Sequence, residues 1–113
     1  MKAGWQVAPD RQNNRTMTNL TNDFIRVQTY SSGLVQGVNY RWFVMERARE
    51  LGVCGWVKNL PDGRVEAELE GRKDAVNALL DAMKVGPRAA HVTGVTVIPL
   101  SYEGTHKDFQ VRH

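Results

Sequence analysis

Two glycines and an arginine at short spacing are the residues of this sequence that could most readily do chemistry. They lie in the segment SSGLVQGVNYR, where Gly33 and Gly37 follow a strand-like run and Arg41 opens a helix-like one. A loop between a strand and a helix gathers backbone N–H groups without partners, and the helix macrodipole adds positive potential. With a guanidinium beside it, such a loop suits a phosphate or a carboxylate. The same spacing also fits a plain strand-to-helix turn with an exposed arginine.

A second polar residue, Asn59, ends the strand-like run GWVKN just before the turn sequence LPDG at 60–63. An amide at the end of a strand can hold a water molecule beside the sheet. Asparagine before a Pro-Asp-Gly turn is also a common turn residue. Spacing alone leaves both roles open.

Periodicity predicts the elements that must position these residues. From Phe24 onward apolar and polar residues alternate, which indicates a strand with one buried face, and residues 40–51 carry a helical apolar stripe that ends at Gly52. We expect the remaining strands at 53–59, 64–70, 91–100 and 109–113, and a second helix at 73–84. The order β-α-β-β-α-β predicts an α+β fold, a ferredoxin-like α/β sandwich with two helices on one face of an antiparallel sheet.

The side chains of these elements predict the core and exclude one class of function. We expect Val44 and Leu51 to face the core from the first helix. In the third strand Glu66, Glu68 and Glu70 should point outward into solvent. An RNA-binding sheet of this architecture needs exposed aromatic residues on its central strands, and glutamates repel phosphate. We therefore expect no nucleic-acid partner.

Length and composition bound the domain organisation. The chain has 113 residues, 42% of them hydrophobic and 24% charged, which suits a single globular domain. Residues 1–23 show no periodicity and are rich in Asn and Thr, so we expect an N-terminal extension there and the folded domain at 24–113. Residues 1–16 account for two of the three net positive charges, which leaves the rest of the chain nearly neutral.

The cysteine and histidine residues bear on the cellular compartment of the protein and on whether it binds a metal ion. The single Cys54 excludes an internal disulfide framework, and the sequence shows no secretion signal and no apolar run of membrane-spanning length. We therefore expect a cytoplasmic protein without membrane association. His91, His106 and His113 lack ligand spacing, so no metal site is expected, and Cys54 reads as a small buried hydrophobe.

Both motifs together resemble those of the acylphosphatase family. GLVQGVNYR at 33–41 is similar to the first family signature, and GWVKNLPDGRVE at 55–66 is similar to the second. The Gly-Pro pair at 86–87 and the closing FQVR also resemble the family, so the likeness covers 24–113. It implies a small-molecule acyl phosphate as substrate and inorganic phosphate as product and inhibitor. We expect a monomer that needs no cofactor.

Carried over residue by residue, the resemblance implies a division of labour within the site. The Arg41 side chain and a run of backbone amides would bind the phosphate, and Asn59 would orient the attacking water. The amides are those of Val35, Gln36, Gly37, Val38, Asn39 and Tyr40. The implied reaction is metal-independent hydrolysis of a carboxyl–phosphate anhydride. Its leaving carboxylate is a weak base, so no strong general acid is required.

Two other functions fit the same sequence. One is a non-catalytic module that binds phosphate or carbamoyl phosphate, similar to the acylphosphatase-like domain of hydrogenase-maturation carbamoyltransferases. The other is a ferredoxin-like domain whose basic extension docks a partner, since this architecture hosts many functions. Turnover of an acyl phosphate separates an enzyme from both.

Overall fold

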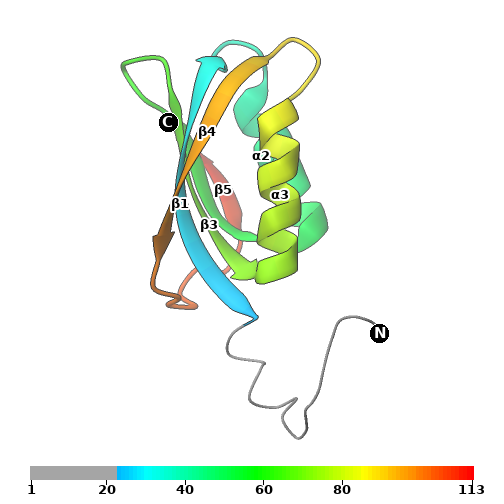
Figure 1. Cartoon of the computed structure of the whole chain (residues 1–113), viewed down its shortest axis with the longest axis vertical. Coiled ribbons are helices and arrows are strands. Elements are labelled where there is room, and N and C mark those ends of the chain that lie inside the picture. Colours follow the sequence, from blue (N-terminus) through cyan, green and yellow to red (C-terminus); the bar gives the residue numbers. More distant parts are fainter. Residues whose placement is uncertain (1–22) are drawn as a thin grey trace, which may run out of the picture.

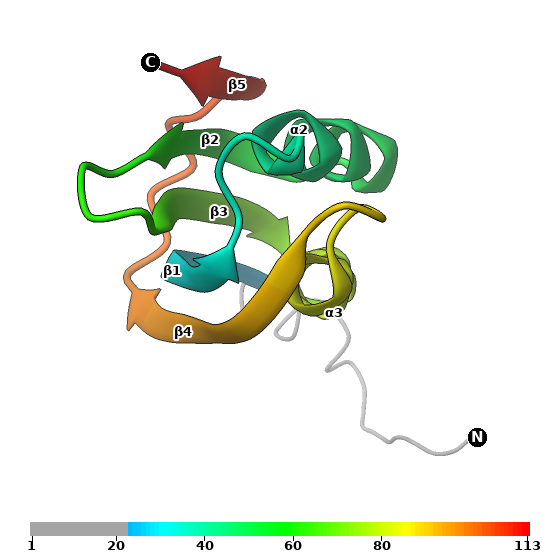
Figure 2. The ribbon, with the colours of Figure 1, turned by 90° about the horizontal axis from the view of Figure 1, so that it is seen from above.

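The computed structural model describes residues 23–113 as two α-helices packed on one face of a five-stranded sheet (Figures 1 and 2). In chain order the elements are β1 Phe24–Leu34, α2 Tyr40–Leu51, β2 Cys54–Asn59, β3 Val65–Arg72, α3 Lys73–Val85, β4 His91–Leu100 and β5 Phe109–Arg112. The strand order is β4-β1-β3-β2-β5. The predicted ferredoxin-like class is confirmed. Strands β1 to β4 pair antiparallel, and β5 joins β2 in parallel.

Helix α2 begins and ends where the local sequence predicts. Gly52 follows it in the left-handed conformation (φ 76°), and the N–H of Val53 donates to the carbonyl of Ala48 at 2.8 Å. Glycine adopts that backbone conformation without the strain that a Cβ would add, so the chain can turn back at once into β2. This short return places the start of α2 and the end of β2 at the same end of the sheet.

The core lies between the helices and the sheet, and one predicted core residue is absent from it. Val44 is fully buried, but Leu51 is 37% exposed, so the expectation for Leu51 was wrong. Leu51 borders a shallow hollow with Ala75 and Ala78 of α3, whose short side chains do not cover it. Met45 is buried instead.

The outer face of β3 is less solvated than alternation predicts. Glu70 is only 3% exposed, because the segment between β4 and β5 crosses it. The backbone N–H groups of Glu103 and Gly104 both donate to Oε2 of Glu70 at 2.9 Å. Burial raises the pKa of Glu70, but these hydrogen bonds outweigh it and hold the pKa below its ordinary value. The same segment brings His106 Nε2 to 2.6 Å from Oε2 of Glu68.

The N-terminal extension predicted at residues 1–23 lies outside the described residues, apart from Asp23. In the part of the chain that is described, neither helix is long and apolar enough to cross a membrane.

Candidate active site

The loop from Val35 to Asn39 follows β1, whose last residues contain a distortion that requires glycine. The pairing of β1 with β4 shifts register between Ser32 and Gly33, and Gly33 has φ 112°. A Cβ on Gly33 would lie 2.2 Å from the carbonyl oxygen of His91, so no side chain fits. Gly37 follows with φ 74°, in a conformation that favours glycine. The two glycines of the first motif are therefore needed for the shape of the loop.

Helix α2 starts without a side-chain cap. Its N-cap, Asn39, has a left-handed backbone (φ 68°), its side chain makes no capping hydrogen bond, and the first turn contains no acidic residue. The first backbone N–H groups of the helix therefore receive no acceptor from the Asn39 side chain. No carboxylate in the first turn compensates the positive end of the macrodipole. Such an end favours an anion.

Tyr40 fixes this helix end to the rest of the fold. Its ring is 1% exposed, and its hydroxyl donates to the carbonyl of Met83 and accepts from the Ser31 hydroxyl, both at 2.9 Å. Burial raises the pKa of Tyr40, although the hydrogen bond with Ser31 opposes that change. The tyrosine is thus neutral and structural, and it holds the loop against β1 and α3.

The Arg41 side chain reaches strand β5. Its Nη1 donates to the carbonyl oxygen of Arg112 at 2.8 Å and lies 3.4 Å from Nδ1 of His113. Parallel pairing sets Arg112 opposite Lys58, one residue before Asn59, so the ends of β2 and β5 lie together. A guanidinium has five N–H donors, and this contact leaves most of them for a ligand. Strand β5 therefore orients the arginine.

A cavity of about 210 Å³ joins these groups to Asn59. Its wall consists of Val35, Gly37, Asn39, Tyr40, Arg41, Trp42 and Asn59. The side-chain oxygen Oδ1 of Asn59 is buried and has no hydrogen-bond partner among residues 23–113. A buried acceptor without a partner costs about 1–3 kcal/mol, so this oxygen is a natural seat for a water molecule.

The structure brings most of the predicted site residues to one cavity. Val35, Gly37, Asn39, Tyr40, Arg41 and Asn59 all line it. Val38 instead packs against the core, and the side chain of Gln36 turns toward the β2–β3 hairpin. The resemblance assigned backbone amides to these two residues, and their roles stay predictions.

Gln36 ties the loop to the hairpin that follows Asn59. Its Nε2 donates to the carbonyls of Leu60 at 2.8 Å and Arg64 at 2.9 Å. Leu60 and Arg64 are also joined to each other by a backbone hydrogen bond. One side chain therefore fixes the distance between the β1–α2 loop and the strand end that carries Asn59.

Replacing Gln36 with glutamate should separate these two halves of the site. A carboxylate has the same shape but no N–H, so it would face two carbonyl oxygens with no donor to offer. We expect the free energy of unfolding to fall by about 1–3 kcal/mol and turnover to fall with it. Urea denaturation and initial rates measure both. The control is Gln110→Glu on the exposed side of β5, and equal effects of the two variants would contradict this role.

Two contributions to the site escaped the sequence. The carbonyl of Arg112 holds Arg41, and the tail gave no sign beyond its strand-like FQVR pattern. Trp42 lines the cavity, and its position directly after Arg41 was the available signal.

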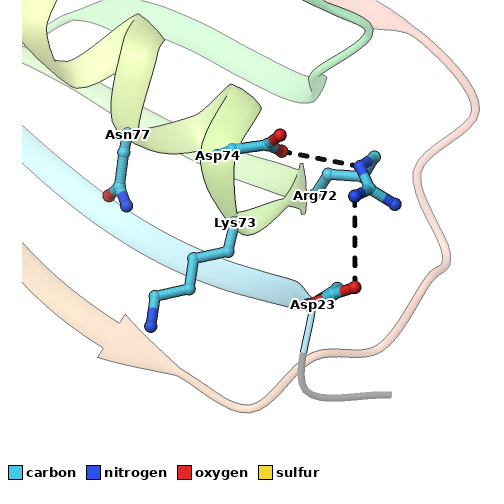
Figure 3. Close-up of a pocket in the computed structure, with 5 residues that line it drawn as sticks. All are labelled: Asp23, Arg72, Lys73, Asp74 and Asn77. Atoms are coloured by element: carbon cyan, nitrogen blue, oxygen red, sulfur yellow. Dashed lines mark ion pairs between the residues drawn. The ribbon is translucent and has the colours of Figure 1, made fainter. Parts of the chain in front are cut away.

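A second hollow, of about 280 Å³, lies at the opposite end of β1 and does not suit an anion (Figure 3). Its wall consists of Asp23, Arg72, Lys73, Asp74 and Asn77. The guanidinium of Arg72 already pairs with Asp74 at 3.5 Å and with Asp23 at 4.0 Å, as the dashed lines show. Two carboxylates thus neutralise the arginine there, whereas Arg41 contacts a neutral carbonyl.

Comparisons with known proteins match the described domain. A family model described as Acylphosphatase matches residues 27–111. A curated acylphosphatase of Rubrobacter xylanophilus is 51% identical over 87 residues, 77% of this chain and 79% of that protein. One from Anaeromyxobacter dehalogenans is 48% identical over 90 residues, 80% of this chain and 97% of that protein. A solved acylphosphatase from Coxiella burnetii superposes with a TM-score of 0.76 at 36% identity, over 81% of this chain and 96% of that one.

The fold and these matches to known proteins show that the chain is a small ferredoxin-like hydrolase. The chain belongs to the acylphosphatase family. Its activity is that of an acylphosphatase, which confirms the expectation from the two sequence motifs.

Proposed function

We propose that this chain hydrolyses acyl phosphates to a carboxylate and inorganic phosphate in the cavity between the β1–α2 loop and the end of β2. The observation that carries the proposal is the unpartnered Oδ1 of Asn59 on the same cavity wall as the Arg41 guanidinium. One group can accept a hydrogen bond from water, and the other can bind the phosphoryl oxygens. Both requirements of phosphoryl transfer to water are thus met within a single cavity.

The reaction follows from these placements. Arg41 and the backbone amides of the loop bind the phosphoryl oxygens, and the uncapped end of α2 adds its positive potential. Asn59 accepts a hydrogen bond from a water molecule and orients its oxygen toward phosphorus. The water oxygen forms the new P–O bond, and the bond from phosphorus to the acyl oxygen breaks. Its electron pair leaves on the carboxylate, and the water proton passes to a phosphate oxygen.

Excess EDTA should leave the rate of acyl phosphate hydrolysis unchanged. The guanidinium and amides supply the positive charge that a metal would supply elsewhere, and a carboxylate leaves without metal assistance. Among residues 23–113 no group of three or more His, Cys, Asp or Glu side chains could hold a metal ion. The measurement is phosphate release from acetyl phosphate and benzoyl phosphate with and without chelator. A magnesium-dependent phosphatase serves as the positive control.

Two results of this assay would contradict the proposal. Loss of activity on chelation, restored by a divalent cation, would show that the enzyme uses a metal. Tight binding of inorganic phosphate without turnover of either substrate would favour the non-catalytic module.

We further propose a cytoplasmic monomer with the domain at 24–113 and an extension before it. The single cysteine suits a reducing compartment, and one chain provides every residue of the cavity wall. The match to the family begins at residue 27, close to the proposed boundary. A nucleic-acid partner is not expected, because Lys58 and Arg26 on the outer sheet face are already paired with Glu66 and Glu68 and do not offer a free positive charge to phosphates.

A further inference from the structure

Trp42 is a large apolar side chain that the fold leaves uncovered. It occupies the first turn of α2, directly after Arg41, and is 52% exposed. It lines the cavity that also contains Arg41 and Asn59. Unlike its neighbour Phe43, it is not among the side chains that pack against the core of residues 23–113. Core packing therefore does not account for a tryptophan at this position.

The other aromatic residues within 23–113 all have a partner or a buried place. Tyr40 and Phe109 are 1% exposed. A ring or a cation lies against each of Phe24, Tyr30, Phe43, Trp56 and Tyr102. Across this part of the chain no ring or cation is paired with Trp42. As far as residues 23–113 are concerned, its indole face is therefore available to a ligand.

We propose that Trp42 is the docking surface for the acyl group, and that this enzyme favours acyl phosphates whose acyl group is aromatic or otherwise large and apolar. The inference rests on the proposed function, because it takes the phosphoryl group to be bound by Arg41 and the loop. The acyl group must then extend from the bound phosphorus along the cavity wall. Trp42 is the exposed aromatic group of that wall.

The chemistry of the rest of the wall supports this choice of substrate. Tyr40 and Val35 are each 1% exposed, and the remaining wall residues are glycine, asparagine or arginine. Those polar groups suit the phosphoryl end and the attacking water and offer little apolar area. An aromatic acyl group on the indole would gain stacking and the removal of apolar surface from water, whereas an acetyl group has one methyl to bury.

The test compares two substrates that differ only in the acyl group, benzoyl phosphate and acetyl phosphate. We expect Trp42→Ala to raise the KM for benzoyl phosphate by about three- to tenfold, as expected for the loss of one aromatic contact. The KM for acetyl phosphate and both kcat values should change less than about twofold. Benzylphosphonate and methylphosphonate, which are not hydrolysed, give the same comparison as inhibition constants without turnover.

Two variants control for indirect effects. Trp42→Phe should recover most of the affinity for benzoyl phosphate, because a phenyl ring still stacks. Ile98→Ala removes another exposed apolar side chain, which lies on β4, is 40% exposed and is not on the cavity wall, and it should change the KM for neither substrate. Equal loss with both substrates, or no loss with benzoyl phosphate, would overturn the docking role.

Failure of this inference can be told apart from failure of the proposed function. If the unaltered chain hydrolyses both substrates but Trp42→Ala does not discriminate between them, only the docking role is wrong. If it hydrolyses neither substrate while Trp42→Ala weakens benzylphosphonate binding, the docking surface holds and hydrolysis is wrong.

Discussion

Replacing Asn59 with alanine is expected to lower turnover by about 10²–10³ while inorganic phosphate binds nearly as before. That factor is the usual loss for one preorganised polar group that acts on the transition state. The amide would orient the water without contacting the phosphoryl oxygens, so its removal should affect kcat and spare the inhibition constant of phosphate. Steady-state kinetics with phosphate as competitive inhibitor measures both quantities.

Stability gives this variant a second, independent readout. The Oδ1 of Asn59 is buried without a partner among the described residues, so its removal takes away an unsatisfied acceptor. We therefore expect the melting temperature not to fall, in contrast to most buried substitutions. Asn77→Ala is the matched control, since Asn77 lines the hollow at the other end of the sheet and should leave turnover unchanged (Figure 3). Loss of phosphate binding in Asn59→Ala would contradict the water-orienting role.

Arg41→Ala should impair phosphate binding and turnover together. The guanidinium would hold the phosphoryl oxygens before and during the reaction, so its loss weakens inhibition by phosphate and lowers kcat/KM by at least about 10²–10³. Arg41→Lys should recover little, because an ammonium lacks the planar fork that binds two oxygens at once. Phosphate inhibition and kcat/KM are measured for both variants.

The chain offers a close control for the structural part of this effect. Arg49 also lies on α2 and donates to a β5 carbonyl, that of Phe109 at 3.0 Å, but it does not line the cavity. Arg49→Ala removes the same kind of helix-to-strand contact as Arg41→Ala. If both variants lost activity equally, anchoring of β5 would explain the result and phosphate binding by Arg41 would be wrong.

The sequence by itself determined the elements and the places where the chain turns. Alternation from Phe24, the helical stripe from Tyr40 and the stop at Gly52 depend on neighbours a few positions away, and the structure confirms these elements. The motif that contains Gly33 and Arg41 is equally local. Such patterns can be read along the chain because the period of a strand or helix is set by its own backbone.

Only the tertiary structure decided how those groups meet. The contact of Gln36 with Leu60 spans 24 positions and that of Arg41 with Arg112 spans 71, and neither follows from a local pattern. Glu70 is buried because a distant segment crosses it, which alternation cannot reveal. The oxygen of Asn59 lacks a partner only once the whole wall has formed around it. Burial and partner choice are properties of packing between remote segments, so they emerge only when the sheet order brings the ends of β1, β2 and β5 together.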